Sequence, residues 1–330
     1  MAVTRLEADR VEVRVLMDNW VDMLLPDLTL TDCCVERYGL VEHFDPKTEA
    51  PVAENGLSLL VRIWRGQRQT TILFDVGLTG AALAHNFKVL HEDPSLVDHV
   101  ILSHGHPDHF GGIYEFLRLT RRPVPIVTHP SAFLPRYAVM GDGRTAGFYN
   151  LQLLEASLVE NLGRVVKTRE PIELGWGAIT TGEIPRNTPY EGPTRPPWKG
   201  APGLYQVSAD GQFGLDEVWD EQALAISVSG LGIIVLVGCS HAGVVNSINR
   251  ARDLLGDRPV CAVFGGFHLG FPTTPEENVG LTAASFRELE VQHVVPMHCS
   301  GLRAHANFSS DPRIRYIQPS VGSRFVFGSL

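Results

Sequence analysis

Metal-ligand side chains are concentrated in one six-residue stretch of this chain. They are three imidazoles and one carboxylate: His104, His106, Asp108 and His109. Residues 97–103 before the stretch predict a buried strand, and residues 110–119 after it predict a tight turn into a helix. The stretch is therefore expected on a loop at the C-terminal end of a strand, where α/β proteins usually place chemistry. These donors suit Zn²⁺ or a similar borderline metal.

The spacing of the four side chains predicts how they divide between metal ions. On a loop, alternate residues can face one point, so His104 and His106 can share one metal. Asp108 and His109 can then reach a second metal nearby. Dinuclear sites of this kind hold their ions about 3.5–4 Å apart and activate a water for attack.

Composition excludes several classes of protein. The chain has 330 residues, 44% hydrophobic and 20% charged, and a net charge of −9, which argues against binding to nucleic acid or to an anionic membrane. The most apolar stretch, residues 223–239, is interrupted by Gly230 and Gly232 and predicts two core strands rather than a membrane span. The N-terminus does not resemble a secretory signal. Five cysteines without a CxxC pair favour a reduced, cytoplasmic setting.

Both halves of the chain show strands in hairpins followed by alternating strands and helices. In the first half we expect a hairpin over residues 56–75, a helix over 78–90 and strands at 123–128 and within 165–181. In the second half we expect strands at 223–229, 232–238, 259–264 and 291–297, helices at 244–255 and 275–289, and a strand pair within 313–327. The repeated pattern predicts an α/β fold, a four-layer αββα sandwich, as one domain over residues 1–330.

Two segments depart from this pattern. Residues 131–162 are predicted to be a helical insert with a break at Gly141-Asp142-Gly143. Residues 185–214 are dense in proline and glycine and predict a long loop. Such a loop is either functional, an assembly contact or a plain surface excursion, and the aromatic residues in it make a homodimer an open hypothesis.

Several motifs together resemble a known family. The stretch HGHPDHFGG at residues 104–112 looks like the signature of the metallo-β-lactamase superfamily. Further segments resemble the subfamily named after dihydropterin–ribofuranosylaminobenzene 5'-phosphate synthase: residues 53–58 (AENGLS), 74–77 (FDVG), 180–184 (TTGEI), 238–243 (GCSHAG), 265–269 (GGFHL) and 298–301 (HCSG). The resemblance covers about residues 11–301 and implies the same αββα fold, but fold-level analogy does not choose a substrate.

The resemblance implies three further ligand positions. The last histidine ligand falls on His298. Where a bridging Asp is expected, this chain has Cys239 and then His241; we favour His241 as the ligand, with Cys239 either a thiolate ligand or a buried thiol. Where a middle histidine is expected, Glu183 stands as a ligand, a substrate contact or an ordinary exposed residue. The expected cofactor is one or two Zn²⁺ ions, with Mn²⁺ or Fe²⁺ as alternatives at the second site.

Other residues are predicted to act around the metals. In the tRNA-processing ribonucleases of the superfamily, a histidine between the bridging and last ligands contacts the scissile phosphate, and His268 has a similar place here. We expect His268 to face the substrate or donate a proton, with metal ligation or plain hydrogen bonding as alternatives. Asp75 is expected to orient a ligand histidine, to cap the helix that begins near residue 78, or both. His129 is expected to be structural or pocket-lining.

These expectations describe a metal-dependent hydrolase. A metal-bound hydroxide would attack a small, anionic ester, lactone or phosphoester, with Asp108 as proton acceptor and His268 as oxyanion stabiliser or acid. The loop side chains expected at the substrate are Arg186, Arg195, Trp198 and Tyr205. The alternatives are a transferase or synthase with a pterin-like or phosphoribosyl substrate, and a non-catalytic ligand sensor. A di-iron redox protein is disfavoured by His106, because such relatives usually carry Glu in this motif.

Overall fold

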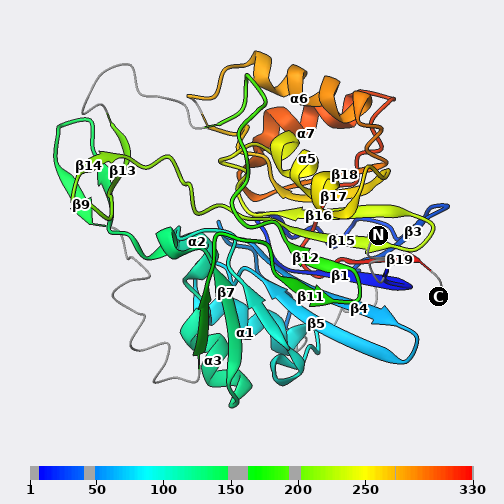
Figure 1. The fold of residues 1–330 in the computed structure, drawn as a ribbon. Helices are drawn as coiled ribbons and strands as arrows, with labels where there is room; N and C mark the ends of the chain where they lie inside the picture. Colours follow the sequence, from blue (N-terminus) through cyan, green and yellow to red (C-terminus); the bar gives the residue numbers. More distant parts are fainter. Residues whose placement is uncertain (1–6, 41–48, 148–162, 193–201, 272, 329–330) are drawn as a thin grey trace, which may run out of the picture.

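Two β-sheets lie face to face in the computed structural model, and helices cover both outer sides (Figure 1). The structure describes residues 7–40, 49–147, 163–192, 202–271 and 273–328. The predicted four-layer αββα sandwich is confirmed.

The first sheet has nine strands and contains the predicted hairpin. Its order is β10 (Gly163–Lys167), β7 (Val124–Thr128), β6 (His99–Ile101), β5 (Arg68–Phe74), β4 (Ser58–Arg65), β1 (Arg10–Met17), β19 (Arg324–Gly328), β3 (Cys33–Glu36) and β2 (Leu28–Thr29). Strands β5, β6, β7 and β10 run parallel, so their C-terminal ends meet at one edge, where the metal-ligand stretch follows β6.

The second sheet has six strands, and a third, smaller sheet lies to one side (Figure 1). The six are β11 (Glu173–Gly175), β12 (Ala178–Thr180), β15 (Leu224–Val228), β16 (Gly232–Val237), β17 (Val260–Gly266) and β18 (His293–Met297). The small sheet contains β14 (Phe213–Leu215), β13 (Gly203–Val207), β8 (Arg136–Val139) and β9 (Thr145–Gly147). Strands β16, β17 and β18 are parallel and bring their C-terminal turns together.

Four of the helices are those that the apolar periodicity predicts, with shifted ends, whereas the helices at residues 107–110 and 301–310 were not predicted. The helices of the described residues are α1 (Gly80–Val89), α2 (Pro107–Phe110), α3 (Ile113–Thr120), α5 (Val244–Leu255), α6 (Glu277–Glu288) and α7 (Gly301–Ser310). Helices α5, α6 and α7 cover the six-stranded sheet, and α1 and α3 cover the nine-stranded one (Figure 1). Among the described residues, no helix has both the length and the apolar character that crossing a bilayer requires.

Strand alternation builds the core. In β4, Leu59 and Val61 face the other sheet, where Phe264 of β17 packs in the same cluster, while Leu60 faces the helix side. Successive side chains of a strand point to opposite faces, so a run of apolar residues in a central strand can serve two interfaces at once. Full burial of each such side chain stabilises the fold by about 1.5–3 kcal/mol.

The helical insert predicted for residues 131–162 is wrong over its described part, which ends at residue 147. A short 3-10 turn, Pro130–Phe133, is followed by strands β8 and β9. The two strands pair around the turn that contains Gly143, which has a φ of +81°. Glycine adopts this conformation without strain, so the break expected within a helix is instead the turn of a hairpin.

Two other segments also differ from prediction. The loop expected at 185–214 contains β13 and the beginning of β14, because β13 pairs with β8, about 65 residues earlier in the chain. The strand pair expected within 313–327 is a single strand, β19, and Tyr316 forms only an isolated bridge with Val294. In each case pairing with a distant strand decided the structure.

Candidate metal centre

The turns at the C-terminal ends of three strands bring the candidate ligands together. The turn after β6 carries His104 and His106, and α2 adds Asp108 and His109. The turn after β16 carries Cys239 and His241, and His298 follows β18 directly: these are the candidate ligands contributed by the second sheet. The site therefore lies at one shared end of both sheets.

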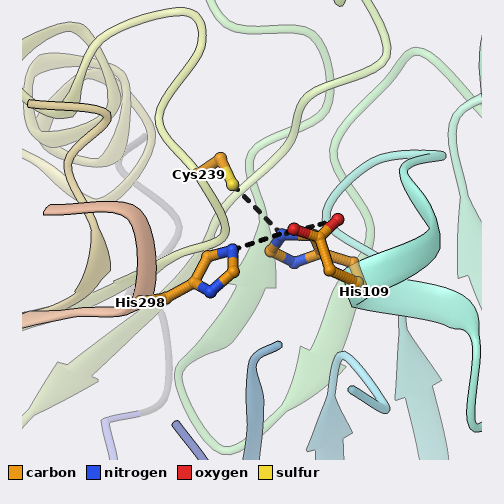
Figure 2. Close-up of side chains that lie close together, drawn as sticks. His109, Cys239 and His298 are labelled. Carbon is orange, nitrogen blue, oxygen red and sulfur yellow. Dashed lines mark hydrogen bonds and ion pairs between the residues drawn. The ribbon is translucent and has the colours of Figure 1, made fainter. Parts of the chain in front are cut away.

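The ligand side chains form two groups. One is the three-histidine group, His104, His106 and His241; the other is the mixed group, Asp108, His109, Cys239 and His298. Within each group the ligand atoms lie within 4.8 Å of one another. Figure 2 shows His109, Cys239 and His298 pointing toward one another, with His109 Nε2 3.1 Å from Cys239 Sγ. The two groups adjoin, since the rings of His104 and His109 have centroids 4.2 Å apart.

The donor sets fit a divalent metal ion. His241 Nε2 and His298 Nε2 are buried and have no hydrogen-bond partner among the described residues. His298 Nε2 lies 3.2 Å from Asp108 Oδ2 without hydrogen-bond geometry. An unsatisfied buried nitrogen costs roughly 1–3 kcal/mol, and a metal ion between the donors would satisfy it. Three imidazoles in one group, and two with a thiol and a carboxylate in the other, are donor sets that zinc prefers.

Burial and neighbouring carboxylates act in opposite directions on the pKa values of the candidate ligand imidazoles. Burial lowers the pKa of His104 and His241 well below the usual value. Burial also opposes the charge of His109, but the carboxylates of Asp75 and Asp108 outweigh it and raise the pKa of His109 to about 9. Neutral imidazoles carry the free lone pair that a metal ion needs.

Asp75 holds His109 in place. Its Oδ2 lies 2.6 Å from His109 Nδ1, and its Oδ1 accepts a 2.7 Å hydrogen bond from the Ser103 backbone N–H. This contact leaves His109 Nε2 to face the mixed group, as expected for an orienting carboxylate. The alternative of a helix cap is wrong, because Thr79 is the residue that caps α1.

Several non-glycine residues of the site have left-handed backbone conformations. The φ angles are +57° at Asp75, +61° at Ser240, +52° at His268 and +47° at His298. Each such conformation costs of order 1–3 kcal/mol and persists only where the surroundings enforce it. Their concentration around the two groups supports a functional role for this end of the sheets.

His268 lies beside the three-histidine group. Its ring centroid is 4.3 Å from that of His241 and 4.3 Å from that of Phe271, with which it stacks. Burial lowers the pKa of His268 to about 4, so its imidazole is neutral near pH 7. His268 is in neither candidate ligand group, and its predicted contact with a substrate stays a prediction.

The other predicted residues lie around the site or outside the described residues. Glu183 is in neither group: its Oε2 is 3.3 Å from His129 Nε2 and 3.3 Å from Arg169 Nη1. His129 is buried, with Nδ1 accepting the Ser131 N–H, which agrees with a structural role. Arg186 stacks over Trp219, with its guanidinium carbon 4.2 Å from the ring centroid.

Two substrate candidates fall in residues that the structure does not describe, and a third is buried. Arg195 and Trp198 lie within 193–201, outside the described residues. Tyr205 is 5% exposed and stacks on Phe213 with a centroid distance of 5.2 Å, so its ring packs within the small sheet.

Sequence reasoning missed buried carboxylates that hold the ligand turns. Asp18 accepts a 2.7 Å hydrogen bond from the His298 N–H, and Glu221 accepts a 2.8 Å bond from the His241 N–H. Asp216 lies 3.3 Å from His106 Nε2. A signal for two of the three existed, since four carboxylates fall within residues 216–221, directly before a buried strand.

We expect Cys239→Ala to remove the ion of the mixed group and leave that of the three-histidine group. Burial raises the pKa of the Cys239 thiol well above its usual value, but a coordinated metal deprotonates a thiol outright. The loss of affinity should exceed the roughly 10–100-fold that an outer-sphere partner is worth. Metal titration and loss of the cobalt–thiolate charge-transfer absorption measure it. Cys261→Ala, which removes a buried thiol in neither group, is the control; unchanged binding in Cys239→Ala would contradict the assignment.

The fold and the site identify the class of protein. The family model of the metallo-beta-lactamase superfamily matches residues 52–255, and the chain belongs to this superfamily. Among curated proteins, it is 32% identical over 278 residues to the 7,8-dihydropterin-6-methyl-4-(beta-D-ribofuranosyl)-aminobenzene-5'-phosphate synthase of Methanocaldococcus jannaschii, covering 84% of this chain and 91% of the relative. The predicted resemblance to the subfamily named after this synthase is confirmed.

Two further proteins are similar to this chain. A second protein of Methanocaldococcus jannaschii, of uncharacterised function, is 27% identical over 260 residues, which cover 78% of this chain and 88% of the relative. A solved structure described as a metal-dependent hydrolase of the beta-lactamase superfamily superposes with a TM-score of 0.67 at 24% identity, covering 95% of this chain and 98% of the other. At that identity the match supports the fold alone.

Proposed function

We propose that this chain is a metal-dependent hydrolase acting on a small, anionic ester, lactone or phosphoester. The observation that carries the proposal is the pair of adjoining donor groups at the shared end of the two sheets. Seven candidate ligand side chains from three separate turns converge there, and two of their buried nitrogen atoms have no hydrogen-bond partner in the described residues. We take zinc as the metal, with Mn²⁺ or Fe²⁺ as alternatives at the mixed group, which contains a carboxylate.

The side chains around the groups have separable roles in this proposal. Bound metal would lower the pKa of a water toward neutrality and polarise the scissile group. The Asp108 side chain is 24% exposed, so its carboxylate can both bind and accept the proton of the attacking water. His268, neutral beside His241, donates a ring N–H hydrogen bond to the developing oxyanion, and its low pKa argues against the alternative role of protonating the leaving group.

The anionic character of the substrate rests on Arg186. Its guanidinium lies over Trp219, which is 43% exposed, and its Nε is buried without a hydrogen-bond partner in the described residues. Its Nη2 already donates to the backbone carbonyls of Glu217 and Val218, so a phosphate or carboxylate would have to be bound by the remaining part of the guanidinium. Substrate contact by Arg195, Trp198 and Tyr205 stays a prediction, as does the homodimer.

A synthase is the second candidate, because one relative named above is a synthase at 32% identity over most of both chains. In this case the same site would serve a pterin-like or phosphoribosyl substrate, and the product would contain a new bond between two substrates. A non-catalytic ligand sensor is the third candidate, and the complete donor groups make it the weakest.

The test is metal content of the purified protein together with turnover of an ester, lactone and phosphodiester panel. We expect close to two ions per chain and hydrolysis of at least one panel member. Chelation should abolish the turnover and added zinc or manganese should restore it. One ion or none, with no turnover after metal addition, would contradict the hydrolase. A condensation product from a pterin and a phosphoribosyl substrate would favour the synthase.

A further inference from the structure

A buried ion network lies directly beneath the metal-ligand turn. Arg136, the first residue of β8, is 2% exposed, and it donates from Nε to Asp216 Oδ2 at 2.6 Å and from Nη2 to Asp220 Oδ1 at 2.6 Å. Both carboxylates are buried as well. Removing each of the three charges from water costs several kcal/mol. Proteins in which hydrophobic residues replace such a buried network are often equally or more stable, so the network is not explained by stability alone.

The network is bonded to the ligand turn at several points. Asp220 Oδ2 accepts the Gly105 N–H at 2.7 Å, and Arg136 Nη1 donates to the Gly105 carbonyl at 3.3 Å. A Cβ on Gly105 would lie 2.5 Å from Arg136 Nη1 and 2.4 Å from the Ala132 carbonyl oxygen. The backbone between His104 and His106 therefore sits directly on the guanidinium, with no room for a side chain.

Asp216 reaches the ligand histidine itself. Its Oδ2 lies 3.3 Å from His106 Nε2, while the other ring nitrogen, His106 Nδ1, lies 3.0 Å from His104 Nε2. Asp216 is in turn fixed by Arg136 and by the Val218 N–H, which donates to its Oδ1 at 3.0 Å. The carboxylate thus has little freedom to turn away from the imidazole.

We propose that Asp216 is a positioning residue, which holds the Nε2–H of His106 so that Nδ1 is the atom offered to the metal of the three-histidine group. Arg136 and Asp220 act with it by fixing the carboxylate and the Gly105 backbone. This rests on the proposed function, since it requires that the three-histidine group binds a metal.

The mixed group offers an internal parallel. There Asp75 holds Nδ1 of His109 at 2.6 Å and leaves Nε2 to face Cys239. One histidine of each group therefore has a buried carboxylate next to the ring nitrogen that points away from the other donors. In His106 that nitrogen is Nε2, and in His109 it is Nδ1. An outer carboxylate of this kind sets the tautomer and ring orientation of a ligand histidine.

The position of Asp216 also connects the small sheet to the metal. Asp216 follows β14 directly and Arg136 begins β8, so two strands of the small sheet, seen beside the main body in Figure 1, end at the network. Strands β8 and β14, which lie in segments predicted mainly as helix and loop, thus position the residues of the network.

The first test is Asp216→Asn, which keeps the shape of the side chain and removes its charge. We expect the ion of the three-histidine group to bind about 10–100-fold more weakly, as measured by competition with a chromophoric chelator. In the cobalt protein, the ligand-field bands of that ion should change, while the Cys239 charge-transfer absorption should stay. A merely structural role would move both ions together or neither.

The matched control is Asp311→Asn, which removes another carboxylate paired with arginines, Arg287 and Arg313, at the C-terminal end of α7. We expect wild-type metal binding in this variant. Wild-type affinity for both ions in Asp216→Asn would overturn the inference.

A measurement on the wild-type protein keeps the test independent of how the variant folds. In metal-loaded protein with ¹⁵N-labelled histidine, we expect the His106 ring proton on Nε2 and the metal on Nδ1. The opposite tautomer would overturn the inference. If the wild-type protein binds no metal at the three-histidine group, both this inference and the proposed function are contradicted. If the wild-type protein binds metal there and Asp216→Asn binds it with the same affinity, only the positioning role of Asp216 is contradicted.

Discussion

Replacing Asp108 with alanine is expected to reduce hydrolysis by on the order of 10²–10⁴-fold or more, because the residue is both a ligand and the proposed proton acceptor. Its Oδ2 lies 3.2 Å from His298 Nε2 and its Oδ1 3.9 Å from His109 Nε2, so the carboxylate closes the mixed group. The charges of His109 and His298 outweigh burial and hold the pKa of Asp108 well below its usual range. Steady-state kinetics with the active panel member and metal analysis measure the effect, with about one ion lost per chain.

Asp108→Asn separates the two roles of the residue. The amide keeps an oxygen for the metal but cannot accept a proton as a carboxylate does, so we expect metal content closer to wild type with turnover still lost. Asp257→Ala, which removes an exposed carboxylate paired with Arg252, is the control for the loss of a surface acid. Full turnover in Asp108→Ala, with a normal far-ultraviolet circular dichroism spectrum, would refute the metal mechanism.

The second large effect is expected on stability, from Leu236→Ala in β16. Leu236 is fully buried between the two sheets and pairs with Leu224 and Phe264 of the neighbouring strands. Truncation loses the transfer free energy of the side chain and leaves a cavity, which together cost about 3–5 kcal/mol. That is a large part of the ~5–15 kcal/mol by which domains are stable.

Urea unfolding of wild type and variant measures the difference, as a lower midpoint at an unchanged slope. The control is Leu96→Ala, the same substitution at a side chain that is 57% exposed, for which we expect a change within about 0.5 kcal/mol. Equal effects at the two positions would mean that the region between the sheets is not the main core of the protein.

Much of the fold was predictable because its signals are local. The hairpin of β4 and β5, the helix α1 and the strands β16, β17 and β18 all have apolar patterns that need no knowledge of their partners. Strands β8 and β13 were missed since neither has a strong pattern of its own. They are strands because they pair with each other across about 65 residues, and propensity in sheets depends on such partners.

The site divides in the same way. His104, His106, Asp108 and His109 could be identified from spacing alone, since four metal donors within six residues rarely serve packing. His298 needed the family resemblance in addition, because nothing next to it in the chain is a donor of the same group. Arg136 has no motif, and Asp216 has only the local cluster of carboxylates as a signal; their buried ion pair next to the ligand turn reveals what they contact.

Cys239 and His241 show what the sequence alone determined and what it left open. The sequence placed both in one turn after a buried strand and made either a candidate ligand. The tertiary structure places Cys239 in the mixed candidate group and His241 in the three-histidine candidate group, and Ser240 between them has a left-handed φ of +61°. Which donors are close together in the chain, and where a strand ends, depend only on a short segment, so the sequence alone determined both. Which donors share a metal depends on turns from both sheets meeting at one end, and this only the packing of the two sheets decides.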